Sequence, residues 1–483
     1  SRTTPSVVAF ARNGEVLVDY RGGQVTGGAL RAPAIDIGAA TPLLKTLPLP
    51  ADVVTRWLSL QPAGSLRNID LRWRDDGEQS RFGRFHAEGS VDLDGLGWRA
   101  QGNLPGVSGL SARLKGSTRE GEIRLAVGEV VATDSKRNPL GLRTATKAAV
   151  PTETKQQLAL DFGTRFTAPL TFDTFRGKLV WKRAVASDGV VNVHVDASDM
   201  EVGNADALAR FAGTWDSDKL GPGVSNISGT LVRADATSVH RYLPTSVSAH
   251  TRDWLRQAIV KGDARDAKFV VKGALWHFPF HNDQHGVFEI DAQVAGGILD
   301  YADRWPRAES INTRLLFRGS SMYAQVAGAV IAGVPVGATD VKIADMSGSP
   351  AVLDIKGFAA GPMDAFLHWV ADSPVNGWLD GFLATARATG SARLNLSMNM
   401  PLDDTEKTQL NGELILAGNR VDIGGDIPPL DAVNGRLRFT QAELRATDIA
   451  AETLGGPLRL SIATEGGRVK AHAIGSATSS NAP

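Results

Sequence analysis

Apolar and polar residues alternate with a period of two over most of the chain. In residues 191–197 the valines share one face, and residues 288–294 and 391–400 repeat the pattern. Strands with one apolar and one polar face are typical of antiparallel sheets. The positions that we assign to the apolar face are Val191, Val193, Val195, Phe288, Ile290, Val294, Leu394, Leu396, Met398, Leu437 and Phe439.

Helical periodicity is confined to short stretches, and we expect helical insertions near residues 50–60, 250–262 and 361–390, the last as a pair broken around Pro374. Loops are expected near residues 134–156 and 401–409. So few helices are too small to cover the apolar face of such a long run of strands. The sheet therefore has to pack against itself as a sandwich, or curl into a groove.

A degenerate repeat accompanies the alternation. It reads FRGKLVW from Phe175, ISGTLV from Ile227, INTRLLF from Ile311 and VNGRLRF from Val433. Each copy is a turn followed by an alternating strand, and the spacing is irregular, unlike that of a helical solenoid. The repeat favours one continuous repetitive sheet over residues 1–483 rather than separate domains.

The amino-acid composition narrows the classes of function that are open to the chain. Lysine plus arginine equals aspartate plus glutamate, 52 of each, so no net field attracts nucleic acid or an anionic membrane. Cysteine is absent, which excludes disulfides, thiolate metal sites and cysteine nucleophiles. The arginines and aromatic residues of 72–85 resemble a nucleic-acid surface, but the zero net charge favours two ordinary strands. No apolar run approaches the roughly 18 residues of a membrane span, and the first residues lack signal-peptide features.

Three histidines four residues apart, His277, His281 and His285, would share one face of a helix and suggest a zinc site. Pro279 interrupts that helix, and Asp283 alone is weak support for a metal. We therefore expect a turn with solvated histidines, no metal and no cofactor. The sequence also lacks H-E-x-x-H, G-x-S-x-G, P-loop and G-x-G-x-x-G motifs, so we expect no enzyme.

An ordered set of motifs resembles the YhdP-like branch of the AsmA-like proteins of Gram-negative bacteria. It comprises LPLPADVVTRWLSLQPAGSLRNIDLRW, TFRGKLVWKRAV, RYLPTSVSAHTRDWLRQAIVKG, FPF at 278–280, LDYADRWP at 299–306, LLFRGSSMYAQ and VNGRLRF. The resemblance extends from about Leu43 to the end of the chain. The flanking histidines are not part of the pattern.

The resemblance implies an elongated, curled antiparallel β-sheet that forms an apolar groove, with a few short amphipathic helices. It implies non-enzymatic phospholipid transport between inner and outer membranes, with glycerophospholipid tails on the apolar-face residues named above. Helices carrying Trp254, Leu255, Phe366 and Trp378 are candidates for capping the groove.

The resemblance further implies a periplasmic location with an inner-membrane anchor. That anchor, and the contacts with both membranes, would belong to segments that this chain lacks, so we expect a fragment of a longer protein. The sequence identifies no envelope protein partner.

Two alternatives stay open at this point. A closed β-sandwich acting as a structural or assembly scaffold of the envelope would show the same alternation without binding lipid. A β-rich carbohydrate enzyme or binder would need paired carboxylates or exposed aromatic platforms. A groove predicts apolar residues that remain accessible, whereas a sandwich predicts that they are buried.

Overall fold

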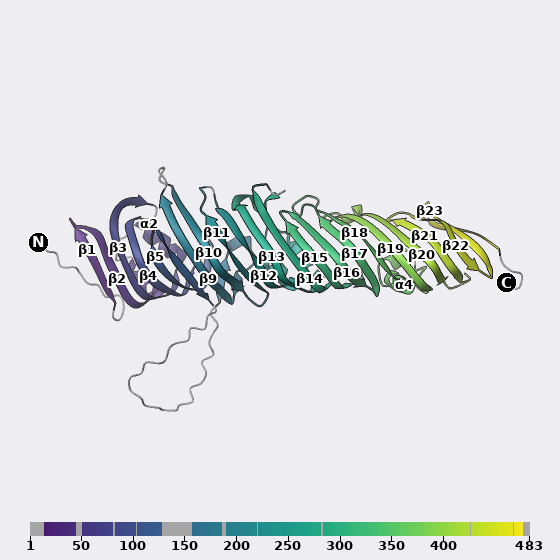
Figure 1. The fold of residues 1–483 in the computed structure, drawn as a ribbon, viewed down its shortest axis with the longest axis horizontal. Coiled ribbons are helices and arrows are strands. Elements are labelled where there is room, and N and C mark those ends of the chain that lie inside the picture. Colours follow the sequence, from purple (N-terminus) through teal and green to yellow (C-terminus); the bar gives the residue numbers. More distant parts are fainter. Residues whose placement is uncertain are drawn as a thin grey trace, which may run out of the picture. The chain divides into compact units, whose positions relative to one another are not determined.

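The computed structural model describes residues 14–44, 51–80, 83–102, 104–127, 157–185, 190–219, 221–281, 284–379, 381–425, 427–466 and 468–476. These residues form a single 24-stranded antiparallel sheet that does not close on itself, with few and short helices (Figure 1). The mainly β, antiparallel fold class predicted from the alternation is confirmed. The loop expected near 134–156 lies outside the described residues.

The chain divides into two compact units. Unit 1 comprises Ser1–Val232, Arg241–Ala249 and Val271–Trp276, and unit 2 comprises Arg233–His240, His250–Val270 and His277–Pro483. Strands β12 (Val224–Asp235) and β13 (Ile259–Ala274) each have residues in both units.

In unit 1 consecutive strands pair antiparallel from β1 to β6, and β6 then pairs with β9, followed by β10 and β11. The short β7 pairs with β5, and β8 pairs with β7. The strands of this unit are β1 (Glu15–Arg21), β2 (Gln24–Asp36), β3 (Ala63–Ser80), β4 (Gly83–Trp98), β5 (Gly106–Ser117), β6 (Glu120–Val127), β7 (Leu158–Asp161), β8 (Leu170–Phe172), β9 (Thr174–Val185), β10 (Val191–Gly203) and β11 (Ala207–Asp216).

In unit 2 each strand from β14 to β24 pairs antiparallel with the next one along the chain. These strands are β14 (Gly286–Leu299), β15 (Ala308–Arg318), β16 (Ser321–Ile331), β17 (Val334–Ile343), β18 (Val352–Pro362), β19 (Arg387–Pro401), β20 (Gln409–Asp422), β21 (Leu430–Thr440), β22 (Leu444–Thr453), β23 (Gly456–Glu465) and β24 (Arg468–Gly475).

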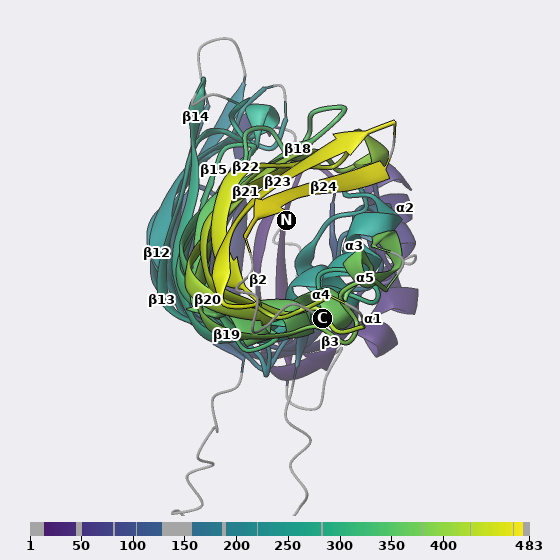
Figure 2. The ribbon, with the colours of Figure 1, turned by 90° about the vertical axis from the view of Figure 1, so that its right-hand side faces the viewer.

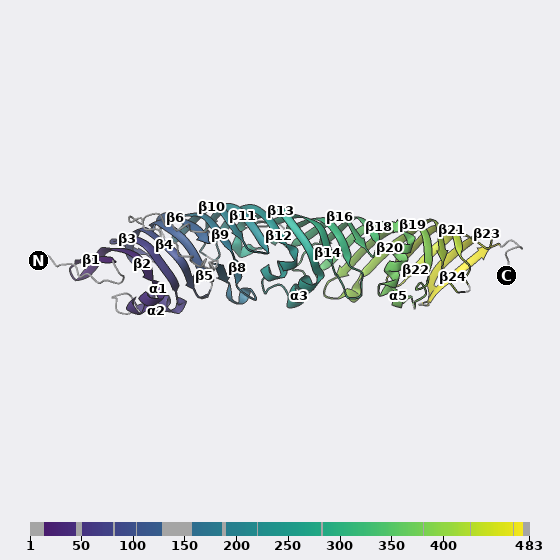
Figure 3. The ribbon, with the colours of Figure 1, turned by 90° about the horizontal axis from the view of Figure 1, so that it is seen from below.

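Helices occupy connections between strands. In unit 1, α1 (Ile37–Leu44) and α2 (Ala51–Leu60) join β2 to β3, and both lie beside these strands in Figure 3. The sequence predicted a helix over 50–60 but not α1. The helix α3 (Ala249–Ala258) ends four residues before the predicted end at residue 262, and β13 begins directly after it at Ile259.

The helices α4 (Met363–Ala371) and α5 (Val375–Trp378) join β18 to β19 in unit 2. The predicted helical pair is therefore shorter than expected, because α5 is a single turn of helix and is followed by non-helical turns. Figure 2 shows that the strands of unit 2 curve, and that α4 and α5 lie together at the open side of the curve. The expected loop near 401–409 contains a short 3-10 turn, Thr405–Lys407.

β-Bulges recur where strands bend. In β14 the register shifts between Val294 and Gly297, and in β20 between Leu416 and Asn419. A left-handed residue sits inside each shift, Gly296 at φ +63° and Gly418 at φ +67°. An extra residue bends a strand and increases its twist, so repeated bulges curl the sheet.

An asparagine on the neighbouring strand binds each of these two bulges. The Gly296 N–H donates to Oδ1 of Asn312 (3.2 Å), whose Nδ2 donates to the Ser310 carbonyl (3.1 Å). In the same way Gly418 donates to Asn434 (2.9 Å), and Asn434 donates to the Ala432 carbonyl (2.7 Å). Asn312 and Asn434 are the second residues of the repeats INTRLLF and VNGRLRF. In these two copies the sequence repeat marks a bulge.

Ion pairs cross the strands on the polar face. Arg314 binds Asp291 at 2.7 Å, Arg113 binds Asp92 at 2.7 Å, and Arg438 binds Glu413 at 2.9 Å. The hydrogen bond from the arginine lowers the pKa of each carboxyl below its ordinary value. Such exposed pairs add little free energy individually, but opposite charges in register favour the observed alignment.

We expect Asn312→Ala to loosen one bulge without unfolding the sheet. Loss of two hydrogen bonds from a side chain near solvent costs about 1–2 kcal/mol, which corresponds to roughly 5- to 30-fold faster amide exchange after local opening. Hydrogen–deuterium exchange should show this acceleration in β14 and β15 and leave β22 and β23 unchanged. Asn192→Ala, on the exposed side of β10, is the control. Unchanged exchange in β14 and β15 would contradict the role of Asn312.

The ion pairs also predict a pH dependence. Because the folded pKa of Asp291 is lowered, its pairing stabilises the fold above the ordinary carboxyl pKa of about 4, and this contribution is lost as the pH falls through the folded value. The difference in unfolding temperature between wild type and Arg314→Gln should thus be constant from pH 7 to 5, begin to fall near pH 4 and vanish only below the lowered folded pKa of Asp291. Arg304→Gln, which removes a fully solvated pair with Asp303, is the matched control. A difference that vanished already at pH 5 would refute this explanation.

Candidate functional site

The register of unit 2 aligns apolar side chains into rows across the strands. Residues directly opposite each other in an antiparallel pair project to the same face, so consecutive partners define one row. The first row crosses nine strands and contains Val294, Thr313, Val326, Thr339, Gly357, Leu396, Gly412, Phe439 and Leu444.

Two further rows lie beside it on the same face. The second row contains Ala292, Leu315, Ala324, Val341, Ile355, Met398 and Leu410, and the third contains Ile290, Phe317, Met322, Ile343, Leu353 and Met400. We call these three rows together the apolar face of unit 2.

The apolar face stays partly accessible. Apart from Ala292 and Gly412, which are buried, all residues of the three rows are half-buried. A second sheet packed over this face would bury such side chains almost completely. The accessibility argues against a closed sandwich in this unit.

Unit 1 has a corresponding apolar face. One row runs through Val16, Leu30, Leu71, Gly89, Gly116, Gly121, Trp181, Val195 and Trp215. The Trp181 ring covers Gly121, since a Cβ on this glycine would lie 2.1 Å from the ring. In unit 2 the Phe439 ring covers Gly412 in the same manner, at 2.1 Å from such a Cβ. Rings that lie flat on glycines fill gaps without standing out from the face.

The eleven sequence-predicted lining residues are all half-buried. Ile290, Val294, Leu396, Met398 and Phe439 belong to the three rows. Their role as lipid ligands remains a prediction.

The other six lining candidates lie outside the three rows of unit 2. Phe288 contacts the Phe278 ring, with centroids 5.0 Å apart. Val195 belongs to the glycine-rich row of unit 1, while Val191 and Val193 pair with Val185 and Arg183. Leu394 and Leu437 both pair with Leu414, in a row next to α4.

The helix α4 packs on this side of the sheet. Met363, Phe366 and Leu367 are 8%, 6% and 6% exposed, and they form a cluster with Val334, Ala388 and Ala392. Ala359, Leu394, Leu414 and Leu416 pack against the same cluster. Of the predicted capping residues, Phe366 thus covers part of the sheet.

The other capping candidates differ. Trp254 is 41% exposed, and its indole N–H donates to the Tyr301 carbonyl at 3.2 Å. Leu255 is half-buried. Trp378 ends α5, and its side chain lies outside the described part of the structure. A contact that sequence reasoning missed links Trp305 to Trp369 of α4, with ring centroids 5.6 Å apart. No local pattern connects residues so far apart in sequence.

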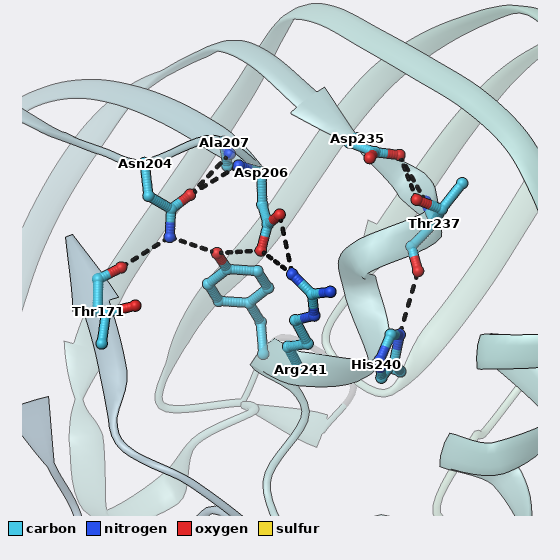
Figure 4. Close-up of polar contacts among 9 residues, drawn as sticks. Thr171, Asn204, Asp206, Ala207, Asp235, Thr237, His240 and Arg241 are labelled. Carbon is cyan, nitrogen blue, oxygen red and sulfur yellow. Dashed lines mark hydrogen bonds and ion pairs between the residues drawn. The ribbon is translucent and has the colours of Figure 1, made fainter. Parts of the chain in front are cut away.

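A polar network in unit 1 fixes the start of the RYLP motif (Figure 4). Both Arg241 and the Tyr242 hydroxyl donate to Asp206, at 3.0 Å and 3.1 Å. Asn204 Nδ2 donates to the Tyr242 hydroxyl (2.7 Å) and to the Thr171 carbonyl (2.7 Å). Burial, together with the neighbouring Asp206, raises the pKa of Tyr242. These contacts tie the segment after β12 to the turn between β10 and β11.

The histidine turn is more ordered than its sequence suggested. The rings of His277 and His285 stack with centroids 4.4 Å apart, whereas His281 Nδ1 lies 3.1 Å from the Ser320 hydroxyl. Asp283 lies outside the described residues. Among the residues that the structure describes, no group of three His, Cys, Asp or Glu is placed to hold a metal ion.

A shallow hollow of about 820 Å³ in unit 2 has a different character, because many of its lining residues are polar. Asn395, Glu413, Arg438 and Arg445 form one row of the polar face there. A general acid at neutral pH requires a raised carboxyl pKa, whereas Arg438 lowers that of Glu413. Glu413 is therefore unsuited to act as the general acid of glycoside hydrolysis.

None of the described helices has both the length and the apolar character needed to cross a membrane.

Comparison with curated proteins and with solved structures gave no match. A family model described as "YhdP protein" matches residues 9–133 and 145–482, nearly the whole chain. The resemblance seen in the sequence motifs is thereby confirmed, and the chain belongs to the YhdP family.

Proposed function

We propose that the protein carries glycerophospholipids between the inner and outer membranes, with the acyl tails on the apolar face. The accessibility of three aligned apolar rows is the observation that supports this function most directly. Membership of the YhdP family supports it independently, because that family suggests bridge-like lipid transport. We also infer that the protein has no enzymatic activity, lies in the periplasm and contacts both membranes.

The energetics fit such a role. The tails of a diacyl lipid bury several hundred square ångströms of apolar surface, worth on the order of 10 kcal/mol at ~25 cal/mol per Å². This is enough to hold a lipid out of water without a covalent bond. The polar head group remains at the open side of the curved sheet. Movement requires neighbouring positions of similar free energy, which rows of Leu, Ile, Val and Met provide.

The scaffold alternative is less consistent with the structure. A scaffold without ligand would leave three rows of apolar side chains in contact with water, at a cost that packing against a second layer would remove. A bound lipid supplies that second layer.

The test is native mass spectrometry of the chain purified without detergent, combined with extraction of bound lipid. We expect several phospholipids per chain, and Leu396→Asp should reduce binding in unit 2 at least tenfold, because a buried carboxylate costs more than about 1.4 kcal/mol. Ser397→Asp is the matched control, since it adds the same charge on the opposite face of the same strand. We expect this variant to bind as the wild type does.

A wild-type chain that carries no lipid and takes up neither added phospholipid nor an apolar dye would refute the proposed function. Equal losses in Leu396→Asp and Ser397→Asp would also count against it, because binding would then not depend on the apolar face.

A further inference from the structure

The helix α4 divides the concave side of unit 2 into a covered and an open part. Phe366 and Leu367 cover Leu394, Ala392 and Ala388 on β19. The next positions on the same face of β19 are Leu396, Met398 and Met400, which belong to the three half-buried rows. The covered part therefore lies at the end of the strands nearest the β18–β19 connection.

Aromatic contacts from a distant connection hold α4 at its outer side. Trp369 of α4 contacts Trp305, and Trp305 contacts Tyr301, with ring centroids 5.6 Å and 6.5 Å apart. Tyr301 and Trp305 belong to the β14–β15 connection, and α4 to the β18–β19 connection. Because β14 and β18 run in the same direction, both connections begin at the same end of the strands.

The α3 helix extends this arrangement, because the Trp254 indole donates to the Tyr301 carbonyl. A series of side-chain contacts therefore runs from α3 through the β14–β15 connection to α4. It lies at the strand ends on one side of unit 2. The position of α4 is set by the protein itself.

The rows that α4 leaves open have a definite width. Successive rows are two residues apart along a strand, so three rows span about 14 Å at ~3.4 Å per residue. Carbon atoms in contact lie about 4 Å apart. Counted outward from α4, the centres of acyl chains lying side by side fall at about 4, 8 and 12 Å, so the two chains of one lipid fit within this width. Four chains side by side do not fit unless α4 moves.

We propose that α4, held in place by Tyr301 and Trp305, is a specificity-determining constriction that restricts the apolar face of unit 2 to lipids with two acyl chains. The proposal rests on the proposed function, because it concerns the same face. It assigns Phe366 and Leu367 to the wall of the constriction, and Trp369 to the contact that keeps the wall closed.

The test is site-specific photocrosslinking in the full chain. Leu396→p-benzoylphenylalanine places the probe in the open row beside α4, and Leu460→p-benzoylphenylalanine places it on β23, beyond the strands that α4 contacts. Each protein is offered vesicles of phosphatidylglycerol, with two chains, or cardiolipin, with four. We expect phosphatidylglycerol adducts at both positions, and at least tenfold fewer cardiolipin adducts at position 396 than at position 460.

Trp369→Ala should release α4 and raise the cardiolipin adduct at position 396 at least fivefold. Trp276→Ala, a matched substitution of a tryptophan that is 64% exposed, should leave it unchanged. Leu367→Ala removes part of the wall without touching the aromatic contacts, and the same increase is expected. Circular dichroism verifies that each variant keeps its β-sheet signal.

The outcomes separate this proposal from the function on which it rests. Equal cardiolipin adducts at positions 396 and 460 of the wild type would overturn the constriction while leaving lipid binding intact. No increase in either Trp369→Ala or Leu367→Ala would overturn the assignment to α4. Absence of adducts with both lipids at both positions would refute the proposed function itself.

Discussion

Each strand must keep its apolar side chains on the same face of the sheet as its neighbours do. The rest of the structure depends on this constraint. A register slip of one residue exchanges the apolar and polar faces of a strand, because side chains alternate with a period of two. In the first row of unit 2 the partners keep the same face over nine strands. Bulges threaten this order, since each adds a residue. Leu416 and Asn419 are three positions apart, yet the bulge at Gly418 returns both to the same face.

The asparagine contacts show how sequence secures that order. Asn434 binds the bulge of the preceding strand through Gly418 and its own strand through Ala432. One side chain therefore fixes two irregularities relative to each other. The bulge and the asparagine that binds it both bend the strand and fix its register. The sheet therefore curls without losing its apolar face.

The sequence predicted well which residues share the apolar face of a strand, because the alternation of apolar and polar residues is a local pattern. Ile290, Leu396 and Met398 lie in the aligned rows to which their parity assigned them. The bulges were not predicted, since left-handed residues at these sites include Ser310, Ala432 and Asp448, which carry no glycine signal. The short α5 and the Trp305–Trp369 contact were also missed. The Trp305–Trp369 contact depends on packing between segments that are distant in sequence, which no periodicity records.

The side chains along the apolar rows are similar to one another, and this similarity bears on the direction of the proposed lipid transport. If neighbouring positions bind a lipid with similar free energy, the wall itself favours neither direction, because a face without differential affinity shifts no equilibrium. Net movement then follows the difference in lipid supply between the two ends. The covered part beneath α4 breaks this uniformity along the strands, at the end near the β18–β19 connection, and leaves the three open rows uncovered. On the proposed function, the repeated rows would allow lipid movement and α4 would limit which lipids move.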